Sequence, residues 1–200
     1  PRLWHRLSPL SLVLRGNGRK RNRARGRPAS HRTPVPLTTP SDRGVVATRE
    51  FYAPRELVFS AYPAPTLVPR WWSPPRHTTV VEKMDVRVGG GWRYVIKDRA
   101  SGVEIMAFSG EYREIVPPGR IVRTENFEPV GPGHECIDTV VFEEIEGGRT
   151  RMTETMVFKA KEDRDMMLQS GMESGFNESL PLPDRRHAAP KTAEAGPDPG

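Results

Sequence analysis

The sequence predicts one α+β domain, in which a curved antiparallel sheet wraps around a C-terminal helix, with disordered tails on both sides. Strand-like segments of alternating hydrophobicity recur between residues 78 and 158, separated by turns rich in Gly and Pro. One strand and two short helical segments precede this run, and an amphipathic helix follows it. The two ends of the chain differ from the middle in composition, which indicates a single domain with tails.

Charge is distributed unevenly along the chain. Residues 1–43 contain eleven Lys and Arg and one acid, whereas residues 44–200 contain twenty basic and twenty-four acidic residues. The high sequence pI of about 9.8 therefore results from the N-terminal arm. A nucleic acid could be bound only through that arm, and we do not expect this. We expect a disordered basic arm at 1–43, a domain at 44–180 and a disordered tail at 181–200.

Cysteine content and hydropathy favour a cytoplasmic setting. Cys136 is the one cysteine, so the chain forms neither an internal disulfide nor a thiolate metal cluster. No apolar run approaches the roughly 18 residues that cross a bilayer. The apolar stretch Leu7–Leu14 contains Pro9 and is followed, not preceded, by strong positive charge, so it is not interpreted as a secretory signal.

The domain is expected to begin with a strand at Val45–Phe51 and a helix opened by Pro54, a residue suited to the first turn. A second helical segment, Ala64–Trp72, follows. The meander then comprises strands at Thr78–Val86, Trp92–Lys97, Val103–Val116, Arg120–Asn126, Cys136–Ile145 and Thr150–Phe158. One long helix begins near Lys161 and stops at Pro181, with an apolar stripe interrupted by Gly171 and Gly175.

Five motifs occur in order along the domain, at Arg49–Phe59, Arg70–Pro74, Met84–Tyr94, Phe108–Ile115 and Ser170–Phe176. Together they resemble the activator of heat shock protein 90 ATPase-like branch of the SRPBCC superfamily. The resemblance implies a helix-grip (Bet v1/START-like) fold in a bacterial, cytoplasmic protein that binds a small hydrophobic molecule. One departure lies at Leu180–Pro183, where two prolines interrupt a helix that family members continue through a Leu-rich segment.

Catalytic and metal-binding patterns are absent from the sequence. The five histidines are scattered without metal-ligand spacing, so neither a metal nor a cofactor is expected. The spacing of His134 and Cys136 does not by itself build a nucleophile pair. The Gly89–Gly91 run precedes a strand and lacks a phosphate-loop pattern, so we interpret it as a tight turn.

Acidic residues are interpreted as solvated ends of strands. Glu143 and Glu144 are neighbours in a strand and point to opposite faces, so they cannot act together. Glu125 and Glu128 receive the same interpretation. The sequence therefore shows no evident catalytic site.

Aromatic and methionine side chains supply the candidate ligand site. Period two places Trp92 with Tyr94 on one strand face, and it aligns Phe108 and Gly110 in another row, where the glycine would leave room for a ligand. Methionines on the last helix would give an adaptable lid. The predicted cavity wall consists of Trp71, Trp72, Trp92, Tyr94, Met106, Phe108, Gly110, Tyr112, Met172 and Phe176.

Three functions stay open at this point. The first is a small hydrophobic-ligand-binding protein. The second is an enzyme of the cyclase/aromatase or hydrolase type, which needs a polar residue inside the cup; Thr139, Glu154 and Arg123 are the candidates. The third is an interaction protein that stimulates a chaperone ATPase, as the name of the branch suggests, although a fold does not by itself carry a function.

Overall fold

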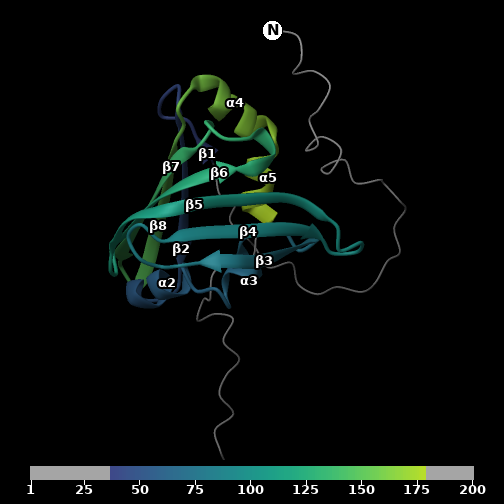
Figure 1. Cartoon of the computed structure of the whole chain (residues 1–200). Coiled ribbons are helices and arrows are strands. Elements are labelled where there is room, and N and C mark those ends of the chain that lie inside the picture. The colour runs from purple at the N-terminus through teal and green to yellow at the C-terminus, as the bar shows by residue number, and fades with distance from the viewer. Residues whose placement is uncertain (1–36, 179–200) are drawn as a thin grey trace, which may run out of the picture.

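The computed structural model describes residues 37–178. Eight strands form one antiparallel sheet in the order β1-β2-β8-β7-β6-β5-β4-β3 (Figure 1). The long meander from β3 to β8 pairs each strand with the next, and β2 closes against β8. The strands are β1 Leu37–Thr38, β2 Gly44–Phe51, β3 His77–Met84, β4 Gly91–Asp98, β5 Glu104–Val116, β6 Arg120–Phe127, β7 Cys136–Ile145 and β8 Arg149–Val157.

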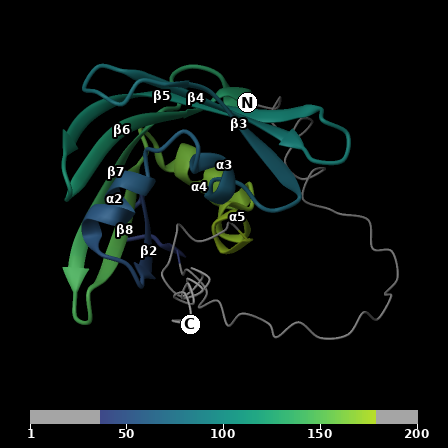
Figure 2. The ribbon, with the colours of Figure 1, turned by 90° about the horizontal axis from the view of Figure 1, so that it is seen from below.

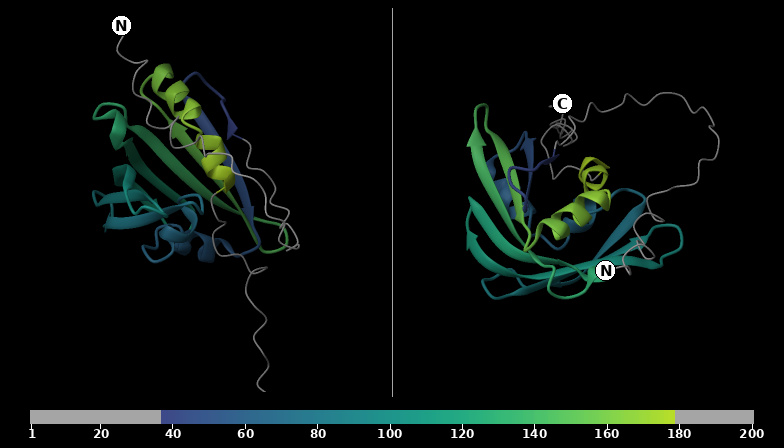
Figure 3. Two further views of the ribbon diagram at one scale, coloured as in Figure 1. Left: turned by 90° about the vertical axis from the view of Figure 1, so that its right-hand side faces the viewer. Right: turned by 90° about the horizontal axis from the view of Figure 1, so that it is seen from above.

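Short helices occupy the concave side of this sheet. The first pair, α2 Arg55–Ala61 and α3 Val68–Trp71, connects β2 to β3, and a 3-10 turn, η1 Glu128–Val130, follows β6. The second pair, α4 Lys161–Gln169 and α5 Met172–Glu178, follows β8. Viewed along the sheet, the strands curve around α4 and α5 (Figures 2 and 3). This arrangement confirms the expected helix-grip class.

The last helix differs from the expectation of one long helix. It is divided into α4 and α5 at Ser170 and Gly171. Gly171 has a φ of 89°, a left-handed conformation that ends helices and that favours glycine. The expectation of a single helix was therefore wrong, and the end expected at Pro181 lies outside the described residues.

Ordered structure starts before the expected boundary at Gly44. Leu37 and Thr38 pair with Ala47 and Val46 of β2. The Ser41 carbonyl accepts a hydrogen bond from Arg164 Nη1 at 3.3 Å, which ties this segment to α4. The boundary at residue 43 was thus placed too late by the few residues of β1 and its turn. Residues 1–36 and 179–200 lie outside the described part, so the expectations for them stay predictions.

Two groups of buried side chains hold the sheet and helices together. The larger packs α2 and α3 against the meander and includes Phe51, Val58, Tyr62 and Phe142. The smaller consists of Val45, Cys136, Met156 and Phe158, with Met167, Leu168, Met172 and Phe176 of the last two helices packed on it. Burial of such apolar surface contributes roughly 25 cal/mol per Å². Within residues 37–178, no helix is both long and apolar enough to cross a membrane.

Candidate functional site

A cavity of about 190 Å³ lies between the concave face of the sheet and the helices α3, α4 and α5. Its wall comes from β2, β4, β5, β6 and β8 on one side, and from the segments Trp71–His77 and Met167–Phe176 on the other. Aromatic rings and methionines supply most of this wall, including Phe108, Phe127 and Met152. The size is below the roughly 300–1,000 Å³ of typical drug-sized sites. The cavity therefore suits a small, mainly apolar molecule.

Six of the ten residues that the sequence placed on the cavity wall line it in the structure. They are Trp71, Trp72, Met106, Phe108, Met172 and Phe176. Trp92, Tyr94, Gly110 and Tyr112 do not line it. A role of the six in ligand binding stays a prediction, because their position alone tests only the geometry.

Packing explains why Trp92, Tyr94 and Gly110 lie away from the cavity. The rings of Trp92 and Tyr94 lie edge-on to Trp72, at centroid distances of 6.0 and 5.0 Å, so they form core behind the wall. The expectation that Gly110 leaves room for a ligand was wrong. A Cβ at that position would lie 1.9 Å from the Thr124 carbonyl oxygen, so the glycine permits close approach of β5 and β6.

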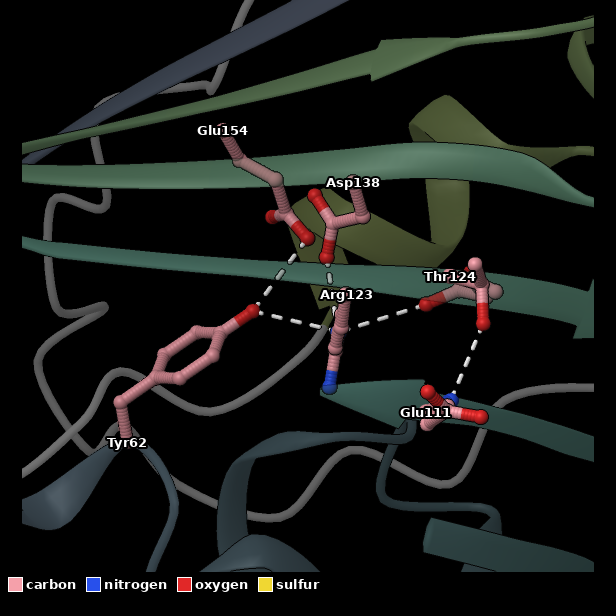
Figure 4. A network of polar contacts seen from close by, with 7 residues as sticks. Tyr62, Glu111, Arg123, Thr124, Asp138 and Glu154 are labelled. Carbon is pink, nitrogen blue, oxygen red and sulfur yellow. Dashed lines mark hydrogen bonds and ion pairs between the residues drawn. The ribbon is translucent and has the colours of Figure 1, made fainter. Parts of the chain in front are cut away.

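A buried cluster of charged side chains lies on the concave face, beside the cavity (Figure 4). Arg123 of β6 is directly opposite Asp138 of β7, and its Nε donates a hydrogen bond of 2.9 Å to Asp138 Oδ2. Arg123 Nη2 donates to Glu125 Oε2 at 3.2 Å and to the Tyr62 hydroxyl at 3.3 Å. The Tyr62 hydroxyl in turn donates to Glu154 Oε1 at 3.4 Å. Side chains from three strands, β6, β7 and β8, and from the C-terminal end of α2 thus gather around one guanidinium.

Aromatic rings surround the same guanidinium. Its carbon lies 4.4 Å from the ring centroid of Trp92, 5.1 Å from that of Trp72 and 5.6 Å from that of Tyr62. Attraction between a cation and aromatic faces contributes about 2 kcal/mol when the pair is desolvated. Because Arg123 is only 1% exposed, its charge depends on these rings and on the acids beside it.

Burial shifts the ionisation of the three acids upward. The pKa of Glu125 is raised to about 7 by desolvation, against the opposing charge of Arg123. Desolvation raises the pKa of Glu154 well above its usual value, and the charge of Asp138 adds to this rise. The pKa of Asp138 is also raised by burial, while Arg123 and a hydrogen bond with Glu154 oppose the rise. Near neutral pH, Glu125 therefore titrates, and burial favours the protonated form of Glu154.

Two members of the cluster, Glu125 and Glu154, also line the cavity. The sequence interpretation of Glu125 as a solvated strand end was wrong, because the residue is only 8% exposed. Of the three polar residues considered for the interior, Arg123 and Glu154 point inward. Thr139 alternates with the inward residues Asp138 and Val140 on β7, so it belongs to the outer face.

Asp138 and Tyr62 were not foreseen as members of a polar site. A sequence signal for Asp138 existed, since period two places it on the same face as Val140 and Phe142, which were expected to be buried together. No comparable signal existed for Tyr62, which falls at an ordinary apolar helix position.

The remaining sequence candidates lie apart from the cavity. His134 Nδ1 is 2.7 Å from Asp163 Oδ1 of α4, an interaction that fastens the loop before β7 to that helix. Cys136 is buried, and desolvation raises the pKa of its thiol far above the usual range, so the thiol stays protonated. Residues 37–178 contain no group of three or more His, Cys, Asp or Glu arranged to hold a metal ion.

The curved sheet closed by C-terminal helices, with a cavity between them, defines the helix-grip class of α+β domains. A family model described as Activator of Hsp90 ATPase homolog 1-like protein matches residues 52–181. The chain therefore belongs to this family, as the sequence motifs implied. A search of curated proteins finds no match.

Solved structures share the fold at low sequence identity. A crystal structure from Rhodobacter sphaeroides matches with a TM-score of 0.65 and 23% identity, over 72% of this chain and 92% of that one. A solution NMR structure from Arthrobacter aurescens matches with a TM-score of 0.64 and 25% identity, over 73% and 87% of the two chains. The AHSA1 protein from Silicibacter pomeroyi gives a TM-score of 0.55 and 22% identity, over 68% and 92%.

Proposed function

We propose that this protein binds a small, mainly apolar molecule in the cavity between the sheet and its last helices. The observation that carries the proposal is the cavity itself, about 190 Å³ in volume and lined by aromatic rings and methionine side chains. Small-molecule sites have this composition, with an apolar wall and a few polar groups that fix orientation.

The lid side of the cavity supports reversible entry. It is made by the α4–α5 junction, with Met167 and Met172 on the two sides of Gly171. Methionine is flexible and fills irregular spaces, so it adapts to ligands of different shape. In addition, Arg49 Nη2 donates a hydrogen bond of 2.7 Å to the Phe176 carbonyl, which ties α5 to β2 on the cavity wall.

A cavity-filling substitution tests this function. Gly175 lines the cavity, has open space where a Cβ would lie and requires no positive φ. Gly175→Leu should therefore fill the cavity without strain. We expect small aromatic and aliphatic compounds to raise the Tm of the wild-type protein, and this shift to be lost in Gly175→Leu.

Gly119→Leu is the matched control, because Gly119 also has no positive φ and only distant neighbours, in the turn between β5 and β6. It should respond to compounds as the wild type does. Compounds that stabilise Gly175→Leu as much as the wild type would show that they bind elsewhere, and the absence of any stabilising compound would refute the proposal.

An enzyme is the second candidate, and one observation favours it. The cyclase/aromatase or hydrolase alternative requires ionisable groups in the cavity, and Glu125 and Glu154 supply them. Their pKa values are both raised, Glu125 to about 7, as suits groups that exchange protons near neutral pH. Turnover of a bound compound that is lost in Glu154→Gln would favour this alternative over simple binding.

Stimulation of a chaperone ATPase is a third candidate, favoured by the description of the matching family. The protein would then act through its surface, so Gly175→Leu should leave this activity intact. An ATPase assay with an Hsp90-type chaperone tests it directly, and an unchanged rate at saturating protein would exclude it.

A further inference from the structure

We propose that the ligand of this cavity is a hydrophobic amine, held in its ammonium form by the carboxylate of Glu125. The inference rests on the proposed binding function and adds the chemical class of the ligand. It starts from an acid, Glu125, that lines a mainly apolar cavity. In small-molecule sites, a small number of polar groups fixes the orientation of the ligand and gives specificity.

Glu125 is an acid of the buried cluster that lines the cavity and has one oxygen without a hydrogen bond; Asp138 Oδ1 also has no partner, but Asp138 does not line the cavity. Glu125 Oε2 accepts the hydrogen bond from Arg123, whereas Glu125 Oε1 has no hydrogen bond within the described part of the chain. Glu154 differs, because its Oε1 accepts from Tyr62 and its carboxyl group also bonds with Asp138. An ionised carboxylate oxygen that has no hydrogen bond and lies on the wall of a mainly apolar cavity is poorly solvated, so a donor from the ligand would stabilise it.

Charge balance favours a positively charged donor. The cluster contains three acids, Glu125, Asp138 and Glu154, and one cation, Arg123. Arg123 is already engaged by Asp138, so the cluster holds more acidic groups than cations. An ammonium group at Glu125 would compensate part of this excess and could lie against the faces of Trp71 or Trp72, in the way that the rings around Arg123 stabilise its charge.

Other ionisable groups also lie near Glu125 or on the cavity wall. Asp138 and Cys136 face Glu125 from β7, Glu154 from β8, and Tyr62 and Tyr94 from α2 and β4. Three basic residues, Arg49, Arg76 and His77, also line the cavity. Arg76 is paired with Glu178, and the pKa of His77 is lowered by burial, so this residue is neutral near pH 7. Arg49, which donates a hydrogen bond to the Phe176 carbonyl, is the residue that a carboxylate ligand would prefer.

The test compares ligands with one hydrocarbon body and different polar groups. Probes are 2-phenylethylamine, 2-phenylethanol and 3-phenylpropanoate, with hexylamine, hexanol and heptanoate as an aliphatic set, titrated into the full chain by calorimetry. We expect an amine to bind at least tenfold more tightly than its matched alcohol at pH 8. Because the pKa of Glu125 is about 7, amine affinity should rise about tenfold between pH 6 and pH 8, whereas alcohol affinity should not.

Glu125→Gln identifies the residue responsible. It should abolish the preference for the amine and leave the affinity for the alcohol within about twofold, whereas Glu143→Gln, an exposed acid of β7, should change neither. A second measurement needs no variant. Amine binding to the wild type at pH 6.5 should release protons from Glu125, which appears as a dependence of the binding enthalpy on the ionisation enthalpy of the buffer.

Each outcome is decisive. Tighter binding of the carboxylate, or equal binding of alcohol and amine, would overturn the amine class while leaving a ligand-binding cavity. A preference for amines that survives Glu125→Gln, or that occurs without proton release, would assign the ammonium to another group and refute the role of Glu125. Failure of every probe to bind would overturn both this inference and the binding function on which it rests.

Discussion

The two faces of the sheet each carry an arginine surrounded by acids, and the two clusters behave differently. On the concave face, Arg123 meets Glu125 and Asp138 and is almost fully buried. On the convex face, Arg93 of β4 meets Glu82, Glu104 and Glu128, and its side chain is 34% exposed. The ion pairs are similar in chemistry, so the contrast isolates the effect of burial.

Solvent decides the direction in which each acid is shifted. Glu128 receives two hydrogen bonds of 2.8 Å from Arg93, and these lower its pKa. Glu125 also accepts a hydrogen bond from an arginine, yet desolvation raises its pKa to about 7. Water near the outer cluster supports the charged form, whereas the apolar cavity opposes it. The outer cluster therefore fastens the η1 turn to the sheet, while the inner one supplies titratable groups to a cavity.

The largest expected difference between the clusters follows removal of each arginine. Arg123→Met leaves Asp138 and Glu125 buried without their cation, and we expect a loss of about 3–5 kcal/mol in the free energy of unfolding. Arg93→Met, on the outer face, should lose about 1 kcal/mol or less. Urea unfolding measures both values.

A double variant separates lost attraction from uncompensated charge. The stability lost in Arg123→Met is expected to come from Asp138, which is then buried without its cation. If so, Arg123→Met combined with Asp138→Leu should recover part of the lost free energy of unfolding. Equal losses from the two arginine variants would show that burial does not distinguish the clusters.

The next effect is a difference in pH dependence. The raised pKa of Glu125 means that the folded state binds its proton more tightly than the unfolded state, whose Glu pKa is the ordinary value. The stability from this group is therefore present at low pH and is lost as the pH rises through about 7. We expect the free energy of unfolding to fall by up to a few kcal/mol between pH 5 and pH 8, at about 1.4 kcal/mol per pKa unit.

Substitution of Glu125 on the concave face and of Glu128 on the convex face should change the free energy of unfolding in different pH ranges. Glu125→Gln should flatten the fall between pH 5 and pH 8. Glu128 has a lowered pKa, so its contribution is present near neutral pH and is lost as the pH falls through its folded value. Glu128→Gln should therefore alter only the acid limb, below about pH 5. Denaturant unfolding at a series of pH values tests this, and an unchanged fall in Glu125→Gln would contradict the assignment.

Much of the fold could be predicted from local pattern, and part of the inner cluster as well. Alternation along β6 and β8 places Arg123 and Glu154 on the buried face, and both were named as inward candidates. The same alternation places Glu125 on the buried face, but the sequence interpretation relied on its charge and assigned it to a solvated strand end. Since Arg123 and Glu125 are two residues apart on one strand, the face of one implies the face of the other.

The remaining features depend on contacts between segments that are distant in sequence. The pairing of Arg123 with Asp138 depends on the β6–β7 register, which follows the path of a long loop that has no simple sequence signal. The aromatic rings around Arg123 come from α2, β4 and the segment after α3, and no periodicity relates them. The division of the last helix depends on which of two glycines adopts the left-handed conformation, and Gly171 does so while Gly175 stays helical.

The smallest expected effect is the response of each cluster to salt. At 1 M salt the Debye length is about 3 Å, so solvent-exposed pairs are screened and buried ones much less. A double-mutant cycle on Arg93 and Glu128 should give a coupling energy of about 0.5–1 kcal/mol at low salt that falls toward zero in 1 M NaCl. The cycle on Arg123 and Asp138, which are 1% and 0% exposed, should keep most of its larger coupling energy. A coupling of the inner pair that falls in proportion to the outer one would show that water reaches Arg123, and the apolar character assigned to the cavity would then be wrong.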